Sequence, residues 1–141
     1  MLRQSQHELV IKTGARSFYE ITGRLEALVR ETGLRTGLAT MQLQHTSASL
    51  LIQENADPEV RRDLERFFAR LVPDGDPLFR HTAEGDDDMP AHIRSALTLT
   101  QLSIPVEQGR MALGTWQGIY VFEHRARAHR RSVVLHLMSD S

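Results

Sequence analysis

Histidine is the residue type that most strongly suggests chemistry in this chain, with seven copies in 141 residues. His81 and His92 flank an acidic segment, and His124 follows a run of strand-forming residues. Neutral imidazole is a common zinc ligand, and three protein ligands with one open position are typical of a catalytic zinc site. No short spacing matches a zinc motif such as His-Glu-x-x-His. The histidines therefore indicate either a metal site or ordinary hydrogen-bonded imidazoles.

Four acidic residues lie between His81 and His92, namely Glu84, Asp86, Asp87 and Asp88. Carboxylates suit magnesium, which one or two of them usually hold together with substrate phosphates. The same cluster fits a solvated loop whose last acid stabilises the N-terminus of a helix opening at Pro90. The residues alone favour the loop and leave the magnesium site open.

A segment of small polar residues contains Thr46, Ser47 and Ser49 directly after His45. Its hydroxyls and backbone amides suit a phosphate, as backbone nests do. They also suit a tight strand connection held by local hydroxyl bonds. A serine nucleophile with His45 as its base is a further alternative, but no Gly-x-Ser-x-Gly motif supports it.

Arg110 precedes one expected strand and Arg125 follows another. Binding residues concentrate at such strand ends and in the adjoining loops of a rigid scaffold. Arginine recognises phosphate bidentately. The competing interpretation is surface ion pairing, which contributes little to stability. Trp116, the only tryptophan, is either a hydrophobic plug or a flat face for an aromatic ring.

Helices are predicted at three places. Ser17 and Glu20 fit a capping box, and an apolar stripe of helical spacing follows up to a stop at Gly33. Asp57 followed by Pro58 marks a second helix start, whose apolar stripe ends before Pro73. A long irregular acidic loop over 74–88 then leads into a short third helix.

Strands account for most of the remaining chain. Alternating or β-rich runs cover the vicinity of residues 9–11, 36–44, 50–52, 99–104, 111–113, 119–122 and 133–137, with the fourth run ending at Pro105. Helices and strands do not alternate strictly, so we expect an α+β fold with a mostly antiparallel core of about seven strands and two to three helices. The length predicts one domain over residues 1–141.

Composition excludes several classes of protein. Without cysteine there are no disulfides, thiolate metal sites or cysteine nucleophiles. No apolar run is long enough for a membrane helix, and the first residues do not resemble a secretory signal, so we expect a cytoplasmic location. The net charge of −1 shows no basic excess over the whole domain, which argues against a nucleic-acid partner.

Five blocks of the sequence together resemble the YjbQ family, whose members are described as secondary thiamine-phosphate synthases. The blocks are residues 45–50 (HTSASL), 54–58 (ENADP), 86–92 (DDDMPAH), 114–120 (GTWQGIY) and 123–125 (EHR). They occur in the family's order and span nearly the whole chain. The resemblance implies a compact α+β domain that forms a homotrimer and carries a polar pocket built from these blocks.

The reaction implied by the resemblance joins hydroxymethylpyrimidine diphosphate to thiazole phosphate and releases diphosphate. A divalent metal, zinc or magnesium, is expected on His81, His92 and His124. Catalytic roles are expected for His45, Glu84 and Asp88. The expected substrate- and phosphate-binding residues are Thr46, Ser47, Ser49, Asn55, Arg110, Thr115, Gln117 and Arg125.

Two other functions stay open. One is a metal-dependent hydrolase whose histidines activate water. The other is a non-catalytic trimer that binds a phosphorylated metabolite without turnover. Bound zinc favours the hydrolase, whereas weakly held magnesium favours the diphosphate reaction.

Overall fold

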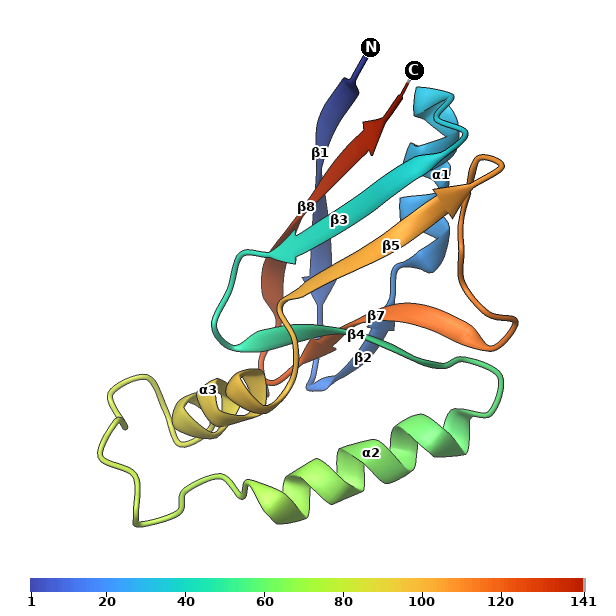
Figure 1. The fold of residues 1–141 in the computed structure, drawn as a ribbon. Helices are drawn as coiled ribbons and strands as arrows, with labels where there is room; N and C mark the ends of the chain where they lie inside the picture. The colour runs from blue at the N-terminus through green and yellow to red at the C-terminus, as the bar shows by residue number, and fades with distance from the viewer. Residues whose placement is uncertain (141) are drawn as a thin grey trace.

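A computed structural model describes residues 1–140, which form eight strands and three helices. Two antiparallel sheets lie one above the other, and the chain termini end side by side (Figure 1). The large sheet has the order β1 (Arg3–Thr13), β8 (His129–Ser139), β3 (Gly37–Leu43), β5 (Gln101–Glu107) and β6 (Arg110–Met111). The small sheet has the order β2 (Ser17–Glu20), β7 (Gln117–Glu123) and β4 (Ala48–Glu54). The helices are α1 (Thr22–Thr32), α2 (Pro58–Leu71) and α3 (Asp88–Leu97). The predicted α+β class is confirmed.

The hydrophobic core lies between the inner faces of the two sheets and α1. Alternation along β3 and β8 places apolar residues on the inner face of the large sheet, such as Met41 and Leu135, which are fully buried. Leu25 and Val29 of α1, at helical spacing, complete this core. Gly37 opens β3 where an added Cβ would lie 2.0 Å from the carbonyl oxygen of Met138, so only glycine lets the two strands approach.

Helix α2 covers the outer face of the small sheet (Figure 1). It begins as predicted, with the Asp57 carboxylate accepting a hydrogen bond from the Glu59 N–H at 2.9 Å. Its apolar stripe is only partly buried, since no α2 residue is buried and Phe67 and Leu71 are about half exposed, at 49% and 53%. The helix therefore packs loosely on the sheet, mainly through Phe68 against Phe122.

Two local predictions are wrong. The capping box does not start a helix, because residues 17–20 form β2 and α1 begins at Thr22 without a side-chain cap. The strand predicted over 99–104 does not stop at Pro105 but continues as β5 to Glu107. Proline is tolerated there because β5 pairs with only the two residues of β6 on its outer side.

The acidic segment is irregular as predicted, although α3 opens at Asp88, two residues before Pro90. The segment and α3 lie at the end of the small sheet where Ala48 of β4 pairs with Glu123 of β7 (Figure 1). None of the three helices in the described part of the chain is long and apolar enough to cross a membrane.

Candidate metal centre

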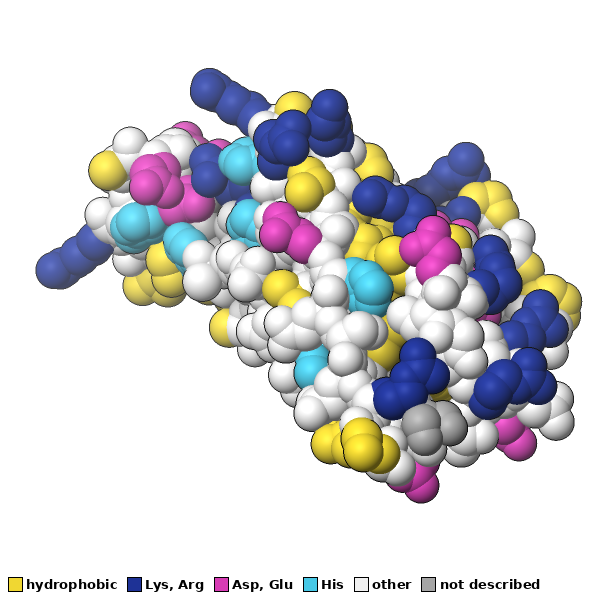
Figure 2. Space-filling model, turned by 90° about the horizontal axis from the view of Figure 1, so that it is seen from above, with side chains coloured by type: hydrophobic (Ala, Val, Ile, Leu, Met, Phe, Trp, Pro, Cys, Tyr) yellow, Lys and Arg dark blue, Asp and Glu magenta, His cyan; other side chains and the backbone are white. Residues whose placement is uncertain are grey.

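Three side chains converge where the acidic segment enters α3. Asp88 and His92 are four residues apart on the helix and so share one of its faces. The loop brings His81 to the same point. The Nε2 atoms of His81 and His92 lie 2.7 and 3.1 Å from the same oxygen, Oδ2 of Asp88. Figure 2 shows histidine, acidic and basic side chains gathered at this end of the molecule.

Arg125 fixes the acidic partners from the opposite side. Its Nη1 lies 2.9 Å from Oδ1 of Asp88, its Nε donates to Asp87 at 2.9 Å, and its Nη2 donates to the Glu84 carbonyl at 3.0 Å. Burial alone would raise the pKa of Asp88, but the hydrogen bond from His81 and the charges of His92 and Arg125 lower it overall. Asp88 is therefore an ionised, almost fully buried carboxylate held in one orientation.

The hydrogen bonds of His92 determine where its proton lies. Its Nδ1 is 3.0 Å from the Thr46 carbonyl oxygen, which only accepts, so Nδ1 carries a hydrogen. A neutral ring then has no hydrogen on Nε2, the atom that faces Asp88. The contact with Asp88 is favourable only if a second proton or a metal ion stands between the two atoms. Such a carbonyl-oriented imidazole is the usual second-shell arrangement of a metal-ligating histidine.

These three residues fit a divalent metal. One ligand atom from each of His81, Asp88 and His92 lies within 4.8 Å of the other two. The histidine side chains are 47% and 33% exposed, so a bound ion would keep a coordination position open to solvent or substrate. His81 also borders a hollow of about 130 Å³ in the acidic loop.

His124 stands outside this group. It is fully buried, and its Nε2 lies 2.7 Å from the Ser49 hydroxyl, which also contacts the Thr98 hydroxyl. Its Nδ1 is buried without a partner in the described chain. Burial, reinforced by the Arg94 charge, lowers the pKa of His124 to about 3. The structure thus brings Asp88 together with His81 and His92, where the sequence prediction had His124.

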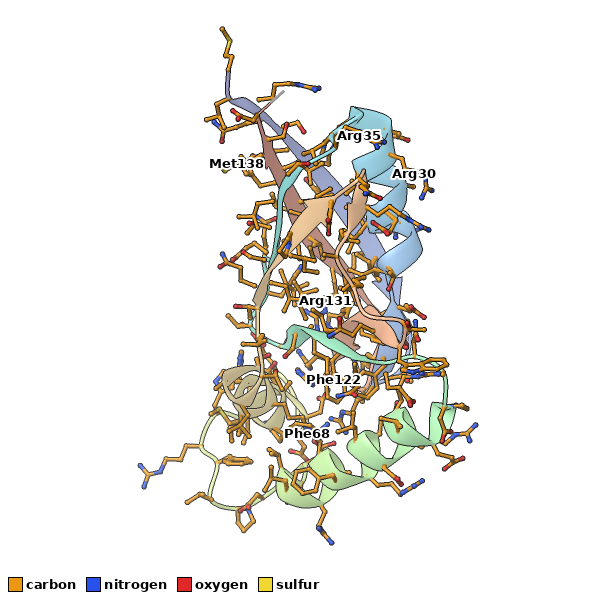
Figure 3. The ribbon with its side chains drawn as sticks, turned by 45° about the vertical axis from the view of Figure 1, so that its right-hand side comes forward. Arg30, Arg35, Phe68, Phe122, Arg131 and Met138 are labelled. Carbon is orange, nitrogen blue, oxygen red and sulfur yellow. The ribbon has the colours of Figure 1, made fainter. Side chains whose placement is uncertain are left out.

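A buried ion pair between Glu123 and Arg131 lies beside the site and is linked to it through the backbone of Arg125. Glu123 accepts hydrogen bonds from Arg131, from the Thr13 hydroxyl at 2.5 Å and from the Arg125 N–H at 3.0 Å. Burial would raise the pKa of Glu123, but these donors lower it. Figure 3 shows Arg131 pointing into the molecule between the sheets. His45 lies nearby, with its Nε2 accepting the Ser132 N–H at 2.8 Å, and burial lowers its pKa.

The predicted phosphate-binding residues fall in three places. Thr46, Ser47, Ser49 and Arg125 lie near the metal centre, and so does Glu84, whose side chain is exposed. Asn55, Thr115 and Gln117 lie at the opposite end of the small sheet, where Glu54 pairs with Gln117. Six residues of strand separate the two ends, about 20 Å. Arg110 lies in the β5–β6 hairpin, where it lines another hollow with Arg30 and Arg35 (Figure 3).

Sequence reasoning gave Arg131 no role, and it named Asp87 only as part of the acidic cluster and Glu123 only as part of the block 123–125, without an individual role. The i,i+4 spacing of Asp88 and His92 was visible in the sequence and could have identified Asp88 as a ligand. The Glu123–Arg131 pair carries no such signal, because its two residues meet only through the turn between β7 and β8.

Known proteins are similar to this chain in sequence and in fold. The family model described as "UPF0047 protein YjbQ-like" matches residues 7–140. A UPF0047 protein of Synechocystis is 52% identical over 138 residues, covering 98% of this chain and 94% of its own. The UPF0047 protein YjbQ of Escherichia coli O157:H7 is 43% identical over 136 residues, covering 96% and 98%. A crystal structure of an uncharacterised YjbQ/UPF0047 protein from Clostridium acetobutylicum superposes with a TM-score of 0.82 at 37% identity, covering 91% of this chain and 97% of that one. The chain therefore belongs to the YjbQ (UPF0047) family.

Proposed function

We propose that the protein binds a divalent metal through His81, Asp88 and His92 and acts on phosphorylated substrates as a secondary thiamine-phosphate synthase. The observation that carries the metal site is the convergence of two imidazole nitrogens on one buried, ionised carboxylate oxygen. The choice of reaction rests on the family resemblance. The bond from the pyrimidine methylene to diphosphate breaks, and diphosphate leaves with the electron pair. A bond from that methylene to the thiazole nitrogen forms.

A bound divalent metal would neutralise charge on the leaving diphosphate. Arg125 adds a fixed positive charge beside it, oriented by Asp87 and Asp88. His45 accepts the Ser132 N–H on Nε2, so its hydrogen resides on Nδ1, which can donate a hydrogen bond that orients a phosphate oxygen. The exposed carboxylate of Glu84 would favour the positive charge that develops on the pyrimidine methylene.

A metal-dependent hydrolase is the second candidate. Two imidazoles and one carboxylate with an open position are the ligand composition of water-activating zinc sites. The half-exposed His81 supports this alternative, because water would reach the ion directly.

Elemental analysis and turnover assays on untagged protein test both candidates. We expect about one metal ion per chain in the wild type and loss of the metal in Asp88→Asn and His92→Ala. His136→Ala, on the outer face of the large sheet, is the matched control and should keep the metal. Thiamine phosphate formation that requires the metal would support the synthase. Zinc retention with phosphate-ester hydrolysis but no coupling would favour the hydrolase. Equal metal content in wild type and Asp88→Asn would refute the site, and tight metabolite binding without turnover would refute both enzymes.

A further inference from the structure

Arg94 of α3 is a buried cation that the protein leaves incompletely satisfied. Its side chain is 1% exposed, and its Nη2 donates to the Val72 carbonyl at 2.9 Å. Its Nε has no hydrogen-bond partner in the described chain, and no carboxylate there forms an ion pair with it. A buried guanidinium without an anion is costly, so this position calls for a negatively charged partner.

Arg94 lines a hollow of about 310 Å³ beneath α2. The helix contributes Arg62, Glu65, Arg66 and Ala69, which recur at i, i+3, i+4 and i+7 and so form one face. This face is polar and ends in a small residue. The side chains of this face line the hollow but do not fill it, so the helix stays separated from the sheet there and none of its residues is buried. Phe122 forms the apolar wall and lies with Phe68 between α2 and the small sheet (Figure 3).

The lining is strongly basic. Four arginines, Arg16, Arg62, Arg66 and Arg94, line it with the single carboxylate of Glu65, which already accepts the Ser17 hydroxyl at 2.8 Å. Arg16 is already paired with Asp74 at 3.0 Å, so the remaining three supply the positive charge available to a ligand. Arg62 and Arg66 pair with Glu59 and Asp63 on the exposed side of the helix. Such exposed pairs contribute little, so both arginines are free to turn toward a ligand.

The hollow is separate from the metal centre. His92 and Arg94 are two residues apart on α3, which places them about 200° apart around the helix. His92 contacts the Thr46 carbonyl, whereas Arg94 contacts the Val72 carbonyl. A ligand in the hollow would therefore approach α3 from the side opposite to His92.

We infer that this hollow is a binding site for the phosphate group of a small metabolite, with the guanidinium of Arg94 as its buried cation, Arg62 and Arg66 closing over it, and Phe122 contacting the apolar part of the ligand. Arginine binds phosphate through paired N–H donors, which suits a buried guanidinium that has no carboxylate partner of its own. The volume lies at the lower end of the range for small-molecule sites, which fits a phosphate on a small body. This inference does not depend on the proposed catalytic function.

The test is an NMR titration of the full-length, chelator-treated protein with inorganic phosphate at constant ionic strength. The arginine Nε–Hε resonances report the contact, and Arg94→Lys assigns the Arg94 signal. We expect a saturating shift of the Arg94 resonance and, with phenyl phosphate, tighter binding. The Arg62→Gln/Arg66→Gln double variant, which changes exposed side chains only, should bind about three- to tenfold more weakly. Arg80→Gln, an exposed arginine outside the hollow, is the matched control.

Removal of metal separates this site from the metal centre, because phosphate bound to a metal ion would then be absent. A drift of many arginine signals without saturation at Arg94 would overturn the inference. Affinity that is the same in the double variant and in Arg80→Gln would do so as well. If Arg94→Lys does not fold, through-bond assignment of the wild type replaces it and the double variant still decides.

Discussion

The buried His124 should make the protein sensitive to mild acid. Its pKa falls from 6.5 in an exposed imidazole to about 3, because burial and the charge of Arg94 disfavour the protonated ring. Between these two values the unfolded chain binds a proton at this position and the folded chain does not. Stability therefore rises with pH through this window and falls as the solution is acidified.

The size of the effect follows from the two pKa values. The slope approaches 1.36 kcal/mol for each pH unit below the pKa of the unfolded imidazole. Lowering the pH from about 7.5 to about 5 should therefore remove about 2 kcal/mol of unfolding free energy through His124 alone. That is a substantial share of the roughly 5–15 kcal/mol by which ordinary domains are stable.

Urea denaturation across this pH range, in buffers free of phosphate and with chelator present, measures the effect. His124→Gln keeps a polar group beside Ser49 but removes the titration. The difference in unfolding free energy between wild type and His124→Gln should shrink by about 2 kcal/mol on acidification. His136→Gln removes a half-exposed imidazole and is the control. Parallel pH profiles for the wild type and His124→Gln would refute the reasoning.

Three further substitutions have defined outcomes in denaturation experiments. Gly37→Ala should cost about 1–3 kcal/mol, because its Cβ meets the Met138 carbonyl; an unchanged midpoint would show that the strands can separate freely. Gly23→Ala, in α1 with no atom within 4 Å of the new Cβ, should stabilise by about 0.5–1 kcal/mol, and a loss would contradict this. Glu123→Gln should cost about 3–5 kcal/mol at neutral pH by leaving Arg131 buried and unpaired, and Arg131→Met in the same chain should recover part of it. Because the pKa of Glu123 is lowered, the difference between Glu123→Gln and wild type should decline as the pH falls below 4.5; a difference independent of pH would argue against an ionised Glu123.

Local signals in the sequence located most elements. Asp57 followed by Pro58 defines the start of α2, and Gln108 with Gly109, both at positive φ, forms the predicted turn between β5 and β6. These features were predictable because a cap or a tight turn depends on residues adjacent in the chain.

Tertiary contacts decided the elements that were mispredicted. The helical pattern beginning at Ser17 gives way to β2 because Phe18 stacks on Phe122 at 4.0 Å and Ser17 binds Glu65. These partners lie far away in sequence, so no local pattern reports them. The same limit applies to the candidate metal centre, where the distance from His81 to Asp88 depends on how the acidic loop folds.

The small polar segment of residues 46–49, which follows His45, makes structural contacts through some of its groups and leaves others without a partner. The Thr46 carbonyl orients His92, the Ser47 carbonyl accepts from Arg131 at 3.1 Å, and the Ser49 hydroxyl holds His124. These contacts attach α3 and β8 to the start of β4 and need no ligand. The hydroxyls of Thr46 and Ser47 form no hydrogen bond within residues 1–140, so the predicted phosphate contact of this segment depends on them. The segment therefore orients His92, one of the proposed metal ligands, through the Thr46 carbonyl, and under the proposed function the exposed Thr46 hydroxyl is the group left for a substrate phosphate.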